Sequence, residues 1–148
     1  MSEDAAIAAA VAEKWIERTF DLYPAEARSS MISVSDPFRN PAGYALKENL
    51  TTLAREVLGG MDIRAVEPAI DALVRLRAVQ DFVPTEALRF MADLRTVIAD
   101  MAGPIPNSMN GRIDELERMA LEKYSACREQ IAGLREKERR FRAQCEAL

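Results

Sequence analysis

The sequence predicts an all-α fold: a single-domain helical bundle with a long C-terminal helix. Apolar residues recur at helical spacing through most of the 148 residues, and proline and glycine residues stand between the periodic segments. The last segment keeps an apolar heptad pattern that no proline interrupts. With 49% apolar and 30% charged residues, the composition fits one soluble globular domain. A chain of this length buries roughly 70% of its unfolded surface and needs no disulfide or metal to form a core.

The periodic segments predict five helices, over residues 3–23, 41–58, 66–82, 84–102 and 110–146. The first helix has an apolar face that contains Trp15 and opposes charged residues, and it ends at Pro24. The connector over residues 25–40 loses this periodicity and is rich in serine. We therefore expect the connector to be irregular or to form only short helical structure.

Proline and glycine residues predict the boundaries of the middle helices. Asn40 followed by Pro41 predicts an N-cap and a first helical position, and the glycines 59–60 end that helix. Pro68 is expected at a helix start. Pro84 suits the first turn of the next helix, which continues to about residue 102.

The last segment contains the longest apolar repeat, a stripe that consists of Ile113, Leu116, Ala120, Tyr124, Cys127, Ile131, Leu134 and Phe141. A helix from Ile113 to the end would span roughly 54 Å, whereas a compact chain of this size has a radius of gyration of about 15 Å. We therefore expect a homodimer that uses this stripe, alone or with the first helix. The alternative is a helix that bends and packs entirely on its own domain. The stripe weakens after Leu134, where Glu138 and Cys145 take apolar positions.

The charge distribution argues against a nucleic-acid partner. The net charge is −4, with 11 basic and 16 acidic residues over 1–109 and 9 basic and 8 acidic residues over 110–148. Affinity for nucleic acid depends on clustered lysine and arginine, and no basic domain is present. Five cations lie between Arg135 and Arg142 against two glutamates. We interpret them as a solvated helix face, and the alternative is a contact for an acidic partner or lipid headgroups.

The residue types argue against an enzyme. The absence of histidine excludes Ser-His-Asp and Cys-His nucleophilic sites, His-ligated zinc and a haem held by a proximal imidazole. The sequence contains no Gly-rich phosphate loop, Cys-x-x-Cys motif or EF-hand pattern. We therefore expect no catalytic residue, no cofactor and no metal. The N-terminus carries no secretory signal and no apolar run could span a bilayer, so the expected location is cytoplasmic, without membrane insertion.

The two cysteines lie eighteen residues apart in the last segment. A continuous helix would separate them by roughly 27 Å, too far for a disulfide, which needs Cα atoms within about 7 Å. Cys127 fits a small buried apolar residue. Cys145, near cations and close to the helix end, is the more reactive position, although an inert thiol is the simpler interpretation.

Two motifs are more specific than helical periodicity requires: Asp36-Pro-Phe-Arg-Asn-Pro-Ala-Gly-Tyr44 and Leu76-Arg-Ala-Val-Gln-Asp-Phe-Val-Pro84. In the first motif, Asp36 and Asn40 can cap a helix, and Phe38 can act as a hydrophobic staple or plug.

In the second motif, Arg77, Gln80 and Asp81 can satisfy backbone groups at a helix junction. The alternative is a polar cluster that binds a small anionic or amide-bearing ligand, with Arg77 as the forked donor.

These motifs, together with Trp15, Tyr124 and Cys127, resemble the N-terminal domain of RsbT co-antagonist proteins of the RsbR and RsbD type. The resemblance implies an all-α sensory or regulatory domain. Related domains look like haem-free globins, form dimers and are joined by a helix to a STAS domain. This sequence contains no STAS domain, so we expect a stand-alone version or a fragment.

Three functions follow from this interpretation. The first is a non-catalytic regulator or adaptor that acts through dimerisation and contacts with a protein partner. The second is a small-molecule sensor with a pocket among the central helices. The third, implied by the resemblance to short relatives, is an accessory subunit of a redox or sulfur-metabolism complex.

Overall fold

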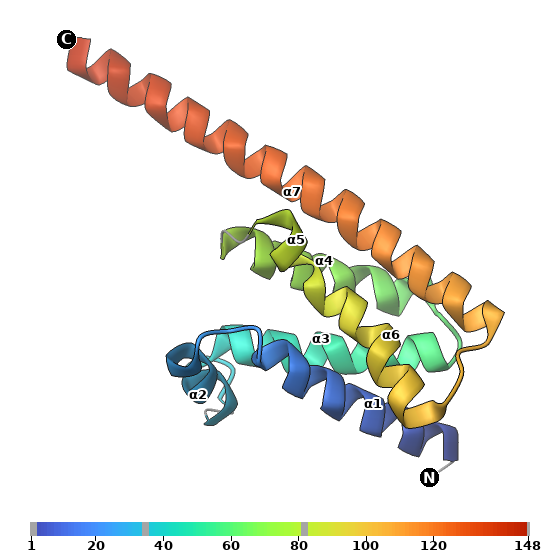
Figure 1. The fold of residues 1–148 in the computed structure, drawn as a ribbon. Helices are drawn as coiled ribbons and strands as arrows, with labels where there is room; N and C mark the ends of the chain where they lie inside the picture. The colour runs from blue at the N-terminus through green and yellow to red at the C-terminus, as the bar shows by residue number, and fades with distance from the viewer. Residues whose placement is uncertain (1–2, 34–35, 81–82, 148) are drawn as a thin grey trace.

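The computed structural model describes residues 3–33, 36–80 and 83–147, and helices form the fold of this part of the chain. The helices are α1 (Glu3–Phe20), α2 (Ala25–Ser33), α3 (Pro41–Leu58), α4 (Ile63–Val79), α5 (Pro84–Ala87), α6 (Arg89–Ala102) and α7 (Asn107–Ala147). Figure 1 shows α7 crossing the body of the molecule and extending well beyond it. The predicted all-α fold with a long C-terminal helix is therefore confirmed.

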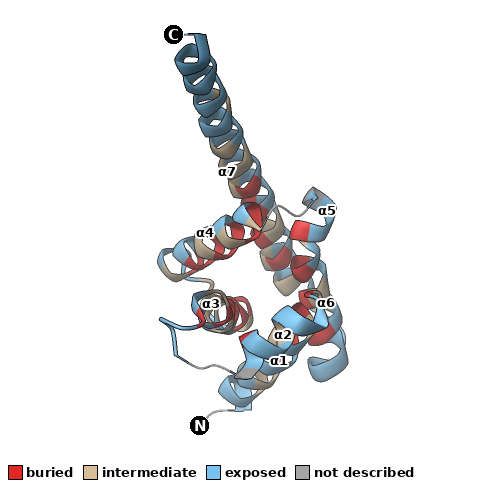
Figure 2. Cartoon of the chain, turned by 90° about the vertical axis from the view of Figure 1, so that its left-hand side faces the viewer, coloured by how far each residue is buried: buried red, intermediate tan, exposed pale blue. Residues whose placement is uncertain are grey.

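The body is a bundle in which α1 packs against α3 and α6, α3 packs against α4, and α4 packs against α7. The buried residues lie on the facing sides of these helices, and the outer part of α7 is exposed (Figure 2). Trp15 is fully buried, and its indole Nε1 donates a hydrogen bond of 2.6 Å to the carbonyl of Phe90. This bond ties α1 to the start of α6, and the two rings stack at 6.3 Å between centroids.

The start and end of α3 agree with the sequence prediction. Asn40 is the N-cap, because its Oδ1 accepts a hydrogen bond of 3.0 Å from the amide of Gly43, and Pro41 is the first helical residue. Gly59 is the C-cap. At the end of α6, Gly103 has a φ of 84°, a left-handed conformation that favours glycine.

The start of α4 differs from the prediction. The helix begins at Ile63, and Asp62 is its N-cap, with Oδ1 accepting a bond of 3.0 Å from the amide of Arg64. Pro68 therefore lies inside the helix and does not start it. The side chain of Asp62 satisfies a free amide of the first turn, so the helix can begin five residues before the proline.

One further segment agrees with expectation, and another segment and one residue depart from it. The connector contains the nine-residue helix α2, which fits the short helical structure expected there. The segment expected as one helix over residues 84–102 is divided at Leu88 into α5 and α6. Phe38 is 95% exposed, so the prediction of a hydrophobic staple or plug is wrong.

Candidate functional site

Helix α7 consists of two parts with different surroundings. Its 41 residues span about 61 Å. We call residues 107–128 the docked half and residues 129–147 the projecting half. The docked half buries residues such as Leu116 and Tyr124, which are at most 2% exposed. In the projecting half, Leu134 and Phe141 are each 66% exposed.

Two arginines fasten the docked half to the ends of other helices. Arg112 Nη1 donates to the carbonyls of Val57 and Gly59, at 2.9 and 2.7 Å, where α3 ends. Arg128 Nη1 donates to the carbonyl of Ala78 at 3.1 Å, where α4 ends. A cation at the carbonyl end of a helix is favourable because the helix dipole is negative there. Neither arginine was predicted from the sequence as a contact between helices. The only feature of the sequence that could have indicated this role is the position of the two arginines beside the apolar stripe.

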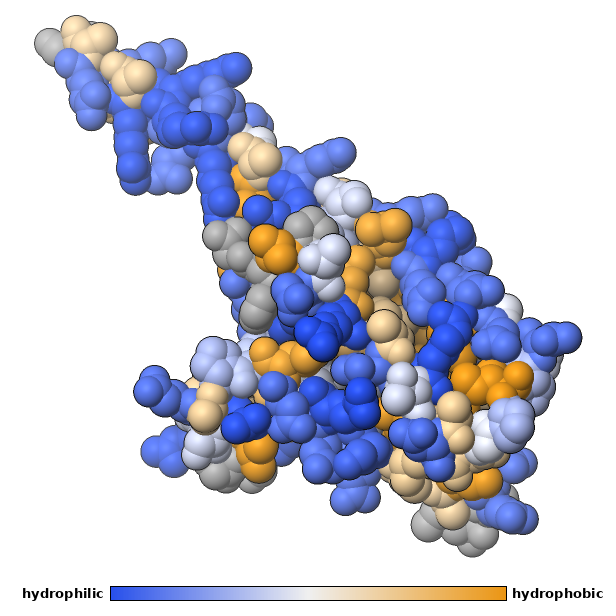
Figure 3. Space-filling model, viewed as in Figure 1, coloured by the Kyte–Doolittle hydropathy of each residue, from blue (hydrophilic) through white to orange (hydrophobic). Residues whose placement is uncertain are grey.

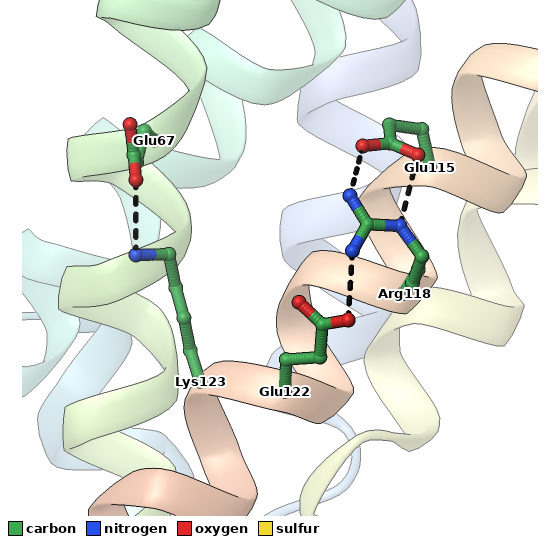
Figure 4. A network of polar contacts seen from close by, with 5 residues as sticks. All are labelled: Glu67, Glu115, Arg118, Glu122 and Lys123. Carbon is green, nitrogen blue, oxygen red and sulfur yellow. Dashed lines mark hydrogen bonds and ion pairs between the residues drawn. The ribbon is translucent and has the colours of Figure 1, made fainter.

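Charged side chains line the outer edge of the docked half (Figure 4). Lys123 Nζ lies 3.5 Å from Glu67 Oε1 and so joins α7 to α4. Arg118 lies between Glu115 and Glu122, both on α7, with 2.7 Å between its Nη1 and Glu122 Oε1. The hydrogen bond from Arg118 lowers the pKa of Glu115, and the two glutamates raise the pKa of Arg118. Only the pair of Lys123 and Glu67 in this figure connects two helices.

The predicted dimer stripe has a part that is buried in its own chain and a part that is accessible. Its first four residues are buried against the body of their own chain: Ile113, Leu116, Ala120 and Tyr124. They are not available to a second copy, which corrects the expected extent of the stripe. Cys127 and Ile131 are half-buried, and Leu134 and Phe141 are exposed. The accessible stripe therefore begins where α7 leaves the body and continues along the projecting half. Figure 3 shows isolated apolar side chains among the hydrophilic ones along this region.

Arg77 lies at a junction of three helices and is 1% exposed. Its Nε donates to the carbonyl of Ala87 and its Nη2 to the carbonyl of Glu86, both at 2.9 Å. The guanidinium carbon lies 5.1 Å from the centroid of the Tyr23 ring. The Tyr23 hydroxyl in turn donates to Gln80 Oε1 at 2.7 Å. These contacts join the exit of α1, the end of α4 and α5, and they favour the architectural interpretation of this motif.

The other predicted site residues occupy a different place. Asn40 Nδ2 donates to the carbonyl of Met31 at 2.7 Å, which ties α2 to the start of α3. Asp36 Oδ1 accepts a bond of 2.9 Å from the amide of Phe38 within the preceding turn. Asp81 lies outside the described residues. The described bonds of Asn40 and Asp36 therefore serve the α2–α3 connection, whereas those of Arg77 and Gln80 serve the α4–α5 junction.

One cavity of about 200 Å³ lies at the end of the bundle. It is mainly apolar and is lined by Asp4, Ile7, Leu58, Ile98, Ala102, Gly103, Pro104, Pro106 and Met109. It lies where α1 begins and where α3 and α6 end. Within the described ranges, no three histidine, cysteine or acidic side chains gather as a metal site. Nor does any helix in that part of the chain have the length and apolar character to cross a membrane.

The comparisons with known proteins identify the family. The model of the RsbT co-antagonist protein rsbRD N-terminal domain matches residues 9–139, which is most of the 148-residue chain. No curated protein and no solved structure matches the chain. The expected relation to globins therefore stays a prediction. The chain belongs to the RsbT co-antagonist protein rsbRD N-terminal domain family, a family of signalling regulatory domains of the stressosome type.

Proposed function

We propose that this chain is a non-catalytic, cytoplasmic regulatory domain that acts through protein contacts on the projecting half of α7. In its simplest assembly this surface binds a second copy of the chain. The observation that carries the proposal is the exposure of Leu134 and Phe141, at 66% each, on one face of a projecting helix. Family membership supports the regulatory role.

The heptad positions support a helix as the occupant of this surface. Leu134 and Phe141 follow Ala120 and Cys127 by fourteen residues, or two heptads. Ala120 is 1% exposed because α7 packs on the body there, and α4 is the main helix that it contacts. Apolar residues that continue a buried stripe into solvent suit a second helix packed along them. Two-fold pairing of identical chains is the commonest way to cover such a surface.

Light scattering at tens of micromolar tests the homodimer. We expect the intact chain to be a dimer and a chain that ends at Leu134 to be a monomer. Phe141→Asp places a charge on the stripe and should also give a monomer. Ala143→Asp adds the same charge at a neighbouring exposed position off the stripe, so this control should remain a dimer. A monomeric intact chain, or a dimer that Phe141→Asp leaves unchanged, contradicts the proposal.

A small-molecule sensor is the second function, and the cavity that supports it lies at the end of the bundle, not among the central helices where a pocket was predicted. Its volume of about 200 Å³ lies below the roughly 300–1,000 Å³ of typical ligand pockets. The exposed stripe is therefore the stronger observation. Native mass spectrometry of the purified chain tests the sensor, because a bound ligand would add a defined mass. Ala102→Trp, at an exposed residue of the lining, should abolish that added mass.

A further inference from the structure

The contact between α4 and α7 has a pattern of charges beside the apolar stripe. On one side of the stripe, Lys123 pairs with Glu67 of α4 at 3.5 Å. On the other side, Arg128 donates to the carbonyl of Ala78 at the end of α4 at 3.1 Å. In heptad terms these two cations occupy the g and e positions, which flank an apolar stripe at a and d. Helix α4 therefore meets α7 with oxygen acceptors on both sides of the stripe.

The same pattern repeats two heptads later, where α4 has already ended. Lys137 and Arg142 follow Lys123 and Arg128 by fourteen residues, and Phe141 stands between them on the stripe. Helix α4 ends at Val79, which is 68% exposed. Figures 1 and 2 show the projecting half continuing beyond the body. Beyond Ile131, which still packs on the core, the projecting half therefore repeats the cations that flank the contact with α4, on a stretch that no described element of the chain covers. The apolar stripe is repeated only in part, because Glu138 stands where the docked half has Tyr124.

The charge of this stretch points to the chemistry of the occupant. Residues 131–147 hold five cations and three anions, a net charge of +2, whereas the rest of the chain has a net charge of −6. Arg142 is paired with Glu138 at 2.7 Å, but both side chains are exposed. An exposed pair of this kind contributes little, so Arg142 can exchange this carboxylate for one on a partner.

A second copy of the chain offers poor partners to the cations that flank the stripe. In a parallel pair, each g position faces the following e position of the partner helix. Lys137 would then face the Arg142 side chain of the second copy, and like charges in this relation are unfavourable. In an antiparallel pair, e positions face e positions, which brings Arg135 and Arg142 together across the interface. A helix with acidic residues at its flanks instead supplies carboxylates to all of these cations.

We propose that residues 131–145 bind an amphipathic helix with acidic flanks from a different protein, in the way that the docked half binds α4. This inference rests on the proposed function, because it identifies the partner of the same contact surface. The partner helix covers Leu134 and Phe141 and pairs its carboxylates with Lys137 and Arg142. It displaces a second copy because it replaces a repulsion between cations with ion pairs.

Two synthetic peptides test the proposal on the full chain. Each contains three heptads with leucine at a and d, and the e and g positions are all glutamate in one peptide and all lysine in the other. Fluorescence anisotropy should show that the acidic peptide binds at least about tenfold more tightly than the basic peptide. Because the ion pairs lie near the surface, raising the salt concentration should weaken binding of the acidic peptide.

Two double variants, which reverse charges beside the stripe or away from it, provide a matched comparison. The double variant Lys137→Glu, Arg142→Glu should lose the acidic peptide and gain the basic one. The control Arg139→Glu, Arg140→Glu makes the same change in net charge at exposed positions away from the stripe. It should keep the preference of the original chain. Each double variant also breaks exposed ion pairs within α7, that of Arg142 with Glu138 in one and those of Arg139 and Arg140 with Glu136 in the other. Such pairs contribute little, so circular dichroism should show the same helical content in both variants.

Three results would overturn the inference. The first is equal binding of the two peptides, and the second is an equal loss of binding in the two double variants. The third is binding of the chain to vesicles of phosphatidylcholine and phosphatidylserine in equal parts without binding of the acidic peptide. Light scattering on the same samples reports the homodimer separately. A monomer that binds the acidic peptide contradicts only the homodimer. A dimer that ignores the acidic peptide contradicts only the inference about the partner.

Discussion

Replacing Arg77 with alanine tests whether this residue holds the junction of α1, α4 and α5 together. The guanidinium is 1% exposed and donates to the carbonyls of Glu86 and Ala87, both at 2.9 Å. It also lies 5.1 Å from the ring centroid of Tyr23. Arg77→Ala removes both bonds and the ring contact, and it leaves a space at the junction.

The expected loss of stability follows from these contacts. The buried carbonyl of Ala87 loses its donor, which costs about 1–3 kcal/mol. The carbonyl of Glu86 belongs to an exposed residue, so water replaces its donor at little cost. The cation–π contact adds roughly 0.5–2 kcal/mol. The lost packing of the side-chain methylenes lowers the free energy of unfolding by about 0.8 kcal/mol each. Part of this loss is offset because the variant no longer has to bury a charged group. We expect a net loss of about 2–4 kcal/mol.

Thermal unfolding followed by circular dichroism measures this loss. For a domain of this size, each kcal/mol shifts Tm by roughly 2–4 °C, so Arg77→Ala should lower Tm by about 5–15 °C. Arg77→Met keeps most of the apolar stem and separates the packing loss from the lost hydrogen bonds. Hydrogen exchange should also become faster in α5. An unchanged Tm for Arg77→Ala would refute the structural role and favour the polar cluster that binds an anionic or amide-bearing ligand.

Three other predictions can be tested by measurement, and the last of them is that no effect occurs. Asn40→Ala removes the N-cap of α3 and the bond to Met31, and urea unfolding should show a loss of about 2 kcal/mol; an unchanged midpoint would contradict this. Arg118 lowers the pKa of Glu115, so the stabilisation from this pair is present above the ordinary carboxyl pKa and is lost as the pH falls through the lowered value. In Arg118→Ala, the NMR titration midpoint of Glu115 should rise. Hemin titration should give no stoichiometric Soret species, because the chain has no histidine; tight one-to-one binding through another ligand would oppose this expectation.

The helices that could be predicted best are those whose boundaries depend on local chemistry. Asn40 and Pro41 start α3 through a cap and a fixed φ, and neither depends on distant residues. The division of the segment over residues 84–102 was not predicted. There, Arg77 donates to the carbonyls at the end of α5, and this contact comes from another helix. A periodic pattern within one segment does not contain that information.

The accessible stripe on the projecting half was predictable only in part, for a similar reason. The heptad repeat of α7 is visible in the sequence, but the point where α7 leaves the body is not. That point depends on where α4 ends and on the bond from Arg128 to Ala78, fifty residues earlier in the chain. Both depend on the arrangement of the bundle, so the sequence could not separate the buried Tyr124 from the exposed Leu134.

The continuity of α7 also has a mechanical consequence. The 19 residues after Arg128 form an arm about 28 Å long, and this arm and the docked half are one helix. A tilt of the docked half by about 5° moves the far end of the arm by roughly 2–3 Å. Conversely, a sideways force on the far end becomes a torque on the bonds of Arg112 and Arg128. Whatever holds the arm therefore acts directly on the ends of α3 and α4, where those bonds are made.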